Sequence, residues 1–341
     1  MSRAWAPVRK GRVRLLVHSD RAHLFLGRLR AEFPAVEAAV CDSYAGVAEV
    51  LCAIRPQIVL SHKFENARYP GKVVAGFDSV EWIHCGGTGV EHFGAWDPDF
   101  LTITNSPGVP AKVMSEFAIA AIYALNLHYP RYMRQQFRHA WGRGSVRQTE
   151  GGTVAVIGLG RIGRAICVRA KAAGLTVIGV RAGKGHVKET DRTLSADRLH
   201  EALASADYVV IVVPRTRLTT NLIDRAALDA MKPSVLLVNL SRGGVVDEAA
   251  LLDALRSGHV RGAALDVFDQ EPLPPESPFW DLENVIVTPH SAGFVEGWEA
   301  PVRELFCGNL ARWLEGSPLR DVVEPEARDN PAPQTSAECD A

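Results

Sequence analysis

Three residues in the second half of the chain have side chains suited to acid–base and anion-binding chemistry. Arg242, Glu271 and His290 each follow an apolar run and lie in a turn-rich context. An imidazole gives and takes a proton near neutral pH, and a carboxylate hydrogen-bonded to it fixes its tautomer and favours its charged form. A guanidinium stays ionised and can hold a carboxylate and polarise a carbonyl. Such a set suits the reduction of a 2-oxo acid, in which hydride reaches C2 while the carbonyl oxygen takes a proton.

Each of the three residues also has an ordinary interpretation when taken alone. His290 follows Thr-Pro and suits a turn or a surface position, Arg242 suits the end of a strand, and Glu271 lies in an acidic, proline-rich loop that suits solvent. All three together, at strand ends of a doubly wound sheet where ligands bind, favour a catalytic set.

A glycine-rich loop precedes these residues and predicts a dinucleotide site. Gly158, Gly160 and Gly163 form a Gly-x-Gly-x-x-Gly pattern between a predicted strand and a predicted helix, inside a unit of about 30 residues. In such a loop the first glycine allows a tight turn, the second lets a pyrophosphate approach, and the third permits close helix–strand packing. The helix N-terminus then offers N–H groups to the phosphates.

The residue at the end of the next strand bears on the choice of dinucleotide. NAD sites usually carry an acid there, which binds the ribose 2′-hydroxyl, whereas this chain has Arg181 with Lys184 nearby. A guanidinium pairs well with the 2′-phosphate of NADP, so NADP(H) is predicted as the preferred cofactor and NAD(H) as an alternative. In the other interpretation Arg181 stacks on the adenine or points into solvent.

Composition limits the class of protein. The 38 basic and 39 acidic residues give a net charge of -1, which offers no reason to expect nucleic acid as a partner. The six cysteines form no Cys-x-x-Cys pair, and no metal site is predicted. No apolar run approaches the ~18 residues of a membrane span, and the N-terminus lacks an apolar signal core. A soluble cytoplasmic protein is therefore expected.

Apolar runs alternate with segments whose apolar residues recur with the period of a helix, which predicts parallel sheets with crossover helices. The runs that predict strands are 13–17, 58–60, 82–84, 101–104, 154–157, 177–180, 208–213, 235–240, 262–267 and 285–287. Helices are predicted at 23–32, 111–126 and 293–315. The helix 111–126 is apolar nearly all round, which favours burial between domains or between subunits.

Five ordered segments resemble the D-isomer-specific 2-hydroxyacid dehydrogenases. They are GLGRIG, VVIVVPRTRLTTNLI, NLSRGGVVDEAALLDAL, GAALDVFDQEPLP and NVIVTPHSAG, with TNSPGVPAKVMSE as a weaker match upstream. The resemblance covers nearly all of 13–320. It implies an α/β fold of two doubly wound parallel-sheet domains, in which a Rossmann cofactor domain is inserted into a flavodoxin-like substrate domain. The helix predicted at 293–315 agrees, since it would return the chain to the first domain.

The resemblance assigns the roles argued above to Arg242, Glu271 and His290. It also implies that the backbone N–H groups of Thr88 and Gly89 bind the substrate carboxylate, together with Arg242. It also implies cofactor contacts, besides those of the three glycines, Arg242 and His290, for Arg161, Ile162, Pro214, Thr219, Leu240, Ser241, Asp266 and Gly293. Asp266 also suits a buried structural acid, because it closes a strand. The chain departs from the family pattern at Arg181, at Glu91 where Asp is frequent, and at Met114 where Thr or Val is common.

The expected organisation is a substrate domain at 1–106 and 292–323, a cofactor domain at 107–291 and a disordered tail at 324–341. The expected activity is reduction of a small 2-oxo acid, such as glyoxylate or hydroxypyruvate, to the D-2-hydroxy acid. One alternative is an NAD-linked dehydrogenase of a bulkier or phosphorylated hydroxy acid, and another is a dinucleotide-sensing corepressor-like protein. A homodimer is expected from the apolar helix 111–126 and the aromatic segment 129–141.

Overall fold

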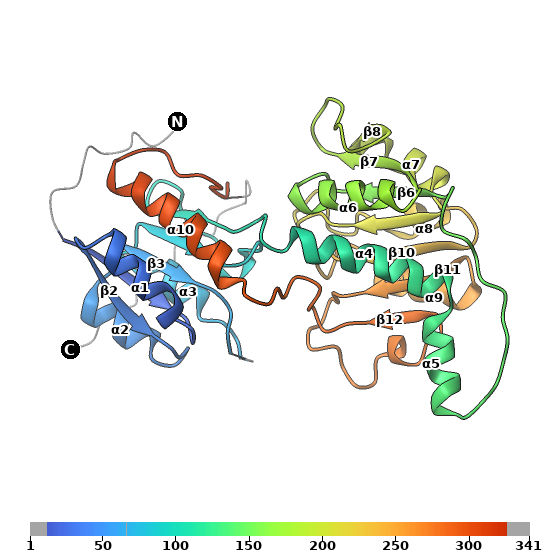
Figure 1. The fold of residues 1–341 in the computed structure, drawn as a ribbon, viewed down its shortest axis with the longest axis horizontal. Coiled ribbons are helices and arrows are strands. Elements are labelled where there is room, and N and C mark those ends of the chain that lie inside the picture. The colour runs from blue at the N-terminus through green and yellow to red at the C-terminus, as the bar shows by residue number, and fades with distance from the viewer. Residues whose placement is uncertain (1–11, 66, 326–341) are drawn as a thin grey trace. The chain divides into compact units, whose positions relative to one another are not determined.

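The computed structural model describes residues 12–65 and 67–325, which form two compact units (Figure 1). One unit contains the described residues up to Val109 together with those from Glu296 onward, and the other spans Pro110–Val295. The chain therefore leaves the first unit, builds the second and returns. These boundaries lie a few residues after the predicted ones. Most of the tail predicted at 324–341 lies outside the described residues.

The first unit contains a sheet of five parallel strands in the order β2-β1-β3-β4-β5. This is the flavodoxin-like order. The strands are β1 (Val13–His18), β2 (Val36–Cys41), β3 (Ile58–Ser61), β4 (Trp82–Cys85) and β5 (Thr102–Thr104). Four of them confirm predicted strands. The sequence did not predict β2, because it is an edge strand whose middle residues are partly exposed and give no continuous apolar run.

Helices cover both faces of this sheet. On one face α1 (His23–Glu32) and α10 (Glu299–Leu314) bury apolar side chains against β1 and β4. The other face is covered by α2 (Val47–Ile54), α3 (Gly71–Ala75) and the short helix η1 (Glu91–Phe93). The prediction of one helix over 293–315 was wrong at its start, because 296–298 form a turn in which Gly297 has a φ of 69°.

The second unit contains seven parallel strands in the order β12-β11-β10-β9-β6-β7-β8. Counted from β6, this is the dinucleotide-binding order with one further strand. The strands are β6 (Thr153–Ile157), β7 (Thr176–Arg181), β8 (Arg192–Ser195), β9 (Tyr208–Ile211), β10 (Val235–Asn239), β11 (Val260–Leu265) and β12 (Val285–Val287). The predicted α/β fold with two parallel sheets is confirmed. Among these seven only β8, a second edge strand, was not predicted.

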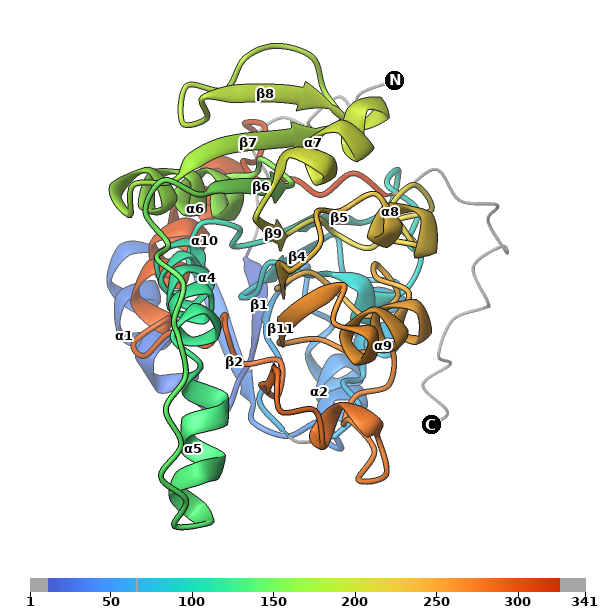
Figure 2. The same cartoon turned by 90° about the vertical axis from the view of Figure 1, so that its right-hand side faces the viewer.

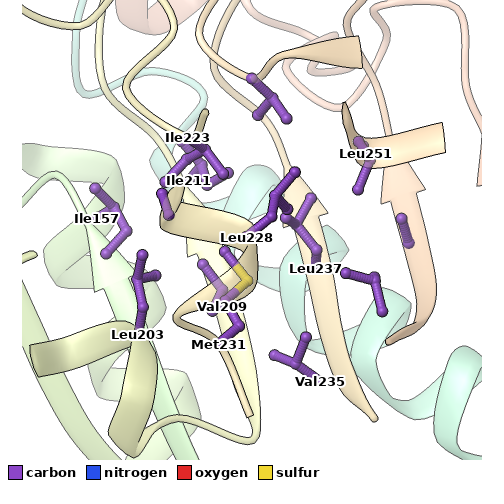
Figure 3. Packing of buried hydrophobic residues seen from close by; sticks show 14 of the residues in the cluster. Ile157, Leu203, Val209, Ile211, Ile223, Leu228, Met231, Val235, Leu237 and Leu251 are labelled. Atoms are coloured by element: carbon purple, nitrogen blue, oxygen red, sulfur yellow. The ribbon is translucent and has the colours of Figure 1, made fainter. Parts of the chain in front are cut away.

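The two faces of the seven-stranded sheet have separate apolar cores. Successive residues of a strand point to opposite faces. Ala155 and Ile157 of β6 pack with α7 (Leu199–Ser205), α8 (Arg225–Asp229) and α9 (Glu248–Ser257), while Val154 and Val156 pack with α4 (Ala111–Asn126) and α6 (Arg161–Ala172). Figure 3 shows part of the first core, where Leu203 and Leu228 meet Val209 and Leu237.

The helix α5 (Tyr129–Phe137) extends beyond the body of the second unit, and the following chain runs back beside it toward β6 (Figure 2). None of its residues is buried within the single chain. Two further short helices, η2 (Ala196–Arg198) and η3 (Pro278–Trp280), belong to loops of the same unit. Across residues 12–65 and 67–325, no helix combines the length and apolar character needed to cross a membrane.

Candidate active site

The predicted catalytic residues lie at one edge of the seven-stranded sheet. All its strands are parallel, so their carboxyl ends share an edge, and this is where ligands bind in doubly wound sheets. Gly158 follows β6, Arg242 follows β10, Glu271 follows β11 and His290 follows β12.

Glu271 and His290 form a hydrogen-bonded pair. Glu271 Oε2 lies 2.8 Å from His290 Nδ1, and Glu271 Oε1 accepts the Phe268 N–H at 3.1 Å. Both side chains keep about two fifths of their surface exposed, 38% for Glu271 and 42% for His290. Burial acts to raise the pKa of Glu271, but the hydrogen bonds from His290 and Phe268 and the charge of Arg242 outweigh it, so this pKa lies below its ordinary value. The carboxylate is therefore ionised at neutral pH and orients the imidazole.

The turn that carries His290 is built around Asp266. The φ of His290 is 51°, a left-handed conformation that is uncommon for a residue other than glycine. The His290 N–H donates to the Asp266 carbonyl at 2.8 Å. The buried Asp266 carboxylate accepts hydrogen bonds from the Thr288 hydroxyl at 2.6 Å and the Ser291 and Ala292 N–H groups at 2.9 and 3.1 Å. These contacts give Asp266 a structural role in holding the imidazole, in addition to the cofactor contact predicted for it.

The loop after β10 brings Arg242 close to the loop of Glu271. The Arg242 charge is near enough to Glu271 to lower the pKa of that carboxyl. Arg242 Nη1 donates to the Ser241 carbonyl at 2.7 Å, and Ser241 itself is buried. Leu240, the residue before it, is also buried and donates its N–H to the Ile211 carbonyl of β9 at 3.0 Å. The structure thus brings the guanidinium, the carboxylate and the imidazole together at one sheet edge.

The glycine loop has the shape that a pyrophosphate needs. Gly158 has a φ of 106°, and a Cβ on it would lie 2.8 Å from the Val212 carbonyl oxygen. A Cβ on Gly163 would come within 1.8 Å of the Gly158 carbonyl oxygen, so only glycine lets α6 approach β6 this closely. A Cβ on Gly160, in contrast, would meet nothing within 4 Å, and no side chain caps α6. A phosphate can therefore approach the N-terminus of α6, where Arg161 and Ile162 begin the helix.

Two other predicted cofactor residues shape neighbouring loops. The Thr219 hydroxyl donates to the Pro214 carbonyl at 2.6 Å and accepts the Thr216 N–H at 2.7 Å, which closes the loop after β9 into a compact turn. Arg181 ends β7, and its guanidinium lies over Gly183, where a Cβ would come within 2.9 Å of Arg181 Nη2. Gly293 follows the His290 turn, near Met114 of α4.

Thr88 and Gly89 lie in the first unit, on the loop after β4. The carbonyl groups of this loop are bound from within the unit: Ser106 N–H donates to the Gly87 oxygen at 3.0 Å, and Asn105 Nδ2 to the Thr88 oxygen at 2.6 Å. The Thr88 hydroxyl is buried without a hydrogen-bond partner among the described residues. Among the described residues the Gly86 N–H of this loop is bound to the Ser61 carbonyl, whereas the N–H groups of Thr88 and Gly89 make no hydrogen bond and can bind an anion.

Sequence reasoning missed several residues that organise the site. Asn105 holds the Thr88 carbonyl, and Asp269 and Glu248 bind main-chain N–H groups of the catalytic loops. The signal available for Asp269 and Glu248 was their position inside the segments that also contain Glu271 and Arg242. Within residues 12–65 and 67–325, no three His, Cys, Asp or Glu side chains gather in a way that suits a metal ion.

Residues 119–292 match the family model "D-isomer specific 2-hydroxyacid dehydrogenase, NAD binding domain". A glyoxylate reductase of Korarchaeum cryptofilum is 34% identical over 232 residues, which are 66% of this chain and 70% of that protein. A D-3-phosphoglycerate dehydrogenase of Archaeoglobus fulgidus is 31% identical over 76% of this chain, but the match spans only 50% of that longer protein.

Among solved structures, a D-isomer specific 2-hydroxyacid dehydrogenase from Xanthobacter autotrophicus in complex with NADPH and MES superposes with a TM-score of 0.79. It is 27% identical, and the match covers 92% of this chain and 99% of that one. The similarity therefore includes both units of the chain.

Proposed function

The chain belongs to the D-isomer specific 2-hydroxyacid dehydrogenase family, and we propose that it reduces a small 2-oxo acid such as glyoxylate or hydroxypyruvate with NADPH. As a member of this family it is an oxidoreductase that acts on the CH–OH group of 2-hydroxy acids with a nicotinamide cofactor. The observation that carries the specific proposal is the convergence of Arg242, Glu271 and His290 at the sheet edge beside the glycine loop.

In the proposed reaction the bound nicotinamide supplies the hydride that reaches C2 of the substrate. His290 donates a proton from Nε2 to the carbonyl oxygen, since its Nδ1 is engaged by Glu271. Glu271 stabilises the imidazolium before the transfer and holds the ring in place afterwards. Arg242 binds the substrate carboxylate and polarises the carbonyl. In the direction of oxidation, His290 takes the hydroxyl proton back.

The preference for NADPH rests on the end of β7. Arg181 occupies the position where an acid would repel a 2′-phosphate, and no ion-pair partner is found for it among the described residues. A guanidinium that needs no other anion is suited to a phosphate. The NADPH complex of the Xanthobacter relative is consistent with this choice.

We further propose that Thr88 and Gly89 bind the substrate carboxylate through their N–H groups. Ser106 and Asn105 bind the Gly87 and Thr88 carbonyls, and the N–H groups of Thr88 and Gly89 make no hydrogen bond among the described residues, so both are available to a ligand. The buried Thr88 hydroxyl, which lacks a partner among the described residues, adds a third donor. On this proposal the first unit is the substrate domain and Pro110–Val295 the cofactor domain.

The alternatives differ in what they need. An NAD-linked dehydrogenase of a phosphorylated hydroxy acid agrees with the Archaeoglobus relative, but Arg181 argues against NAD. A corepressor-like binding protein has no need for the ordered His290–Glu271 pair.

The test of the proposed function is oxidation of NADPH and NADH by the purified protein with a panel of 2-oxo acids. Turnover with glyoxylate or hydroxypyruvate supports the proposal, and no turnover with any member of the panel refutes it.

A homodimer and a cytoplasmic location complete the proposal. The helix α5 and the segment between it and β6 expose five large apolar side chains: Tyr129, Met133, Phe137, Trp141 and Val146. Exposed apolar surface of this kind favours association, and a second copy of the chain is the partner we propose.

A further inference from the structure

Two acidic side chains with no part in the proposed reaction connect the loops that carry the catalytic residues. The Asp269 carboxylate accepts a hydrogen bond from the Gly244 main-chain N–H. Glu248 Oε1, at the first residue of α9, accepts the Asp269 N–H at 2.6 Å. Both contacts join the chain that follows β10, which contains Arg242, to the loop after β11, which contains Glu271.

The main chains of these two loops are in direct contact. A Cβ on Gly243 would come within 2.0 Å of the Phe268 carbonyl oxygen, so a larger residue would force the loops apart. The next residue, Gly244, has a φ of 77°, a conformation in which glycine is favoured. The two glycines therefore let the loop of Arg242 rest on Phe268 and Asp269.

The segment formed by Phe268 and Asp269 is bound on both sides. The Phe268 N–H donates to Glu271 Oε1 at 3.1 Å, and Glu271 Oε2 lies 2.8 Å from His290 Nδ1. The Asp269 N–H donates to Glu248, and the Asp269 carboxylate accepts the Gly244 N–H. A shift of this segment would change the separation between Arg242 and the Glu271–His290 pair.

This arrangement places three carboxyl groups near one another at an electrostatic cost. Burial raises the pKa of Glu248, the hydrogen bond from Asp269 opposes that effect, and the charges of Asp269 and Glu271 raise the pKa further. Like charges that lie close together disfavour ionisation. The contact with the Gly244 N–H requires an acceptor oxygen on residue 269, but it does not require a negative charge.

We propose that Asp269 is a positioning residue of the reaction, supported by Glu248, and that its carboxylate fixes the loop of Arg242 relative to the Glu271–His290 pair. The proposal rests on the proposed function, in which Arg242 binds the substrate carboxylate. Asp269 acts through the main chain of Gly244 and makes no contact with the substrate.

The experiment compares Asp269→Ala, Asp269→Asn and a control, Asp253→Ala. Asp253 is an exposed aspartate of α9 that pairs with Arg225, away from the catalytic loops. For each full-length variant, kcat and KM for the 2-oxo acid are measured, together with the Kd of NADPH and the Kd of oxamate for the NADPH complex. Oxamate is an unreactive analogue of a 2-oxo acid and reports on the Arg242 site without turnover. Thermal unfolding shows that each variant is folded.

For Asp269→Ala we expect KM and the oxamate Kd to rise about tenfold, the upper end of the effect of losing one hydrogen bond, while the Kd of NADPH stays as in the wild type. Asp269→Asn keeps an acceptor oxygen and should restore most of the binding, and Asp253→Ala should behave as the wild type. The inference would be overturned if Asp269→Ala bound oxamate as tightly as the wild type. It would also be overturned if Asp269→Asn bound oxamate as weakly as Asp269→Ala. Neither result would contradict the proposed function. A wild type that neither binds oxamate nor reduces any 2-oxo acid would overturn the proposed function and this inference with it.

Discussion

Glu271 Oε2 lies 2.8 Å from His290 Nδ1, which links the loops that follow the last two strands of the seven-stranded sheet. The same carboxyl group binds the Phe268 N–H, so it is fixed at both oxygens. Its pKa is lowered, and the ionised form therefore persists below the pH at which a solvated glutamate would take up a proton. The pair can orient the imidazole over the whole neutral range.

The first prediction concerns proton transfer. Substitution of His290 by Ala should lower kcat for 2-oxo acid reduction by about 10²–10⁴-fold, the contribution of a positioned acid. Glu271→Gln should lower kcat less, because the ring keeps its proton donor but loses the carboxylate that fixes its orientation through Nδ1. Steady-state rates at pH 7 measure both effects. A kcat of Glu271→Gln that equals the wild-type value would contradict the role given to the carboxylate.

The second prediction concerns the dinucleotide. Arg181→Ala should reduce kcat/KM for NADPH roughly ten- to hundredfold, the value of charge-assisted hydrogen bonds, and should change kcat/KM for NADH little. Lys188→Ala, an exposed cation of the same segment, is the matched control. Equal losses with both cofactors would show that Arg181 does not recognise the 2′-phosphate.

The third prediction concerns the loop of Thr88. Asn105→Ala removes the hydrogen bond to the Thr88 carbonyl, so the loop that carries the proposed N–H donors loses one of the contacts that hold it in the first unit. KM for the 2-oxo acid should rise several-fold, in line with about 1 kcal/mol for one hydrogen bond. The Kd of NADPH should not change, because Asn105 belongs to the first unit. A rise in the NADPH Kd without a rise in KM would refute this assignment.

The fourth prediction concerns assembly. Phe137→Glu and Trp141→Glu place charges on side chains that are 83% and 93% exposed in the single chain. If these side chains are covered by a second copy, the variants should be monomers with near-native thermal stability, whereas the wild type should be a dimer by light scattering. Phe100→Glu alters an exposed phenylalanine of the first unit and should leave the dimer intact. A monomeric wild type at micromolar concentration would exclude the dimer.

The fifth prediction concerns acid stability of the first unit. Burial lowers the pKa of His18 to about 4, of His62 to about 4 and of His84 to about 3. Below about pH 6.5 an unfolded chain protonates these imidazoles while the folded unit does not, so stability falls as the pH drops from 6.5 toward 4. For His18 alone the loss is roughly 3 kcal/mol.

Urea unfolding at pH 7 and pH 4.5 measures this loss. The difference between the two free energies of unfolding should shrink in His18→Gln, because that variant lacks one of the titrating groups. His23→Gln removes an exposed histidine and should keep the wild-type difference. An unchanged difference in His18→Gln would argue against the neutral, buried state of His18.

The sequence predicted those features that depend on local pattern. Strands buried on both faces, such as β9 and β10, appear as continuous apolar runs, and the spacing of Gly158, Gly160 and Gly163 is a local property of one turn. The edge strands β2 and β8 were missed because partly exposed residues interrupt their runs.

Features that depend on distance between separate loops were not predictable in the same way. The contact of Asp269 with Gly244 joins residues 25 positions apart, and that of Asn105 with Thr88 joins residues 17 apart. No local pattern specifies such pairs, because they are set by how the strands are ordered in the sheet. The four contacts of Asp266, likewise, became visible only with the turn around His290 in place.

The return of the chain through α10 has a consequence for biosynthesis. Trp82 of β4 stacks on Phe306 of α10 with ring centroids 5.3 Å apart, and both are fully buried. The strands of the first unit are therefore translated long before the helix that covers one face of their sheet. The whole inserted unit is translated in between. The segment Pro110–Val295 can fold during translation, while the first unit must wait for the last part of the chain, with apolar surface available to chaperones until then.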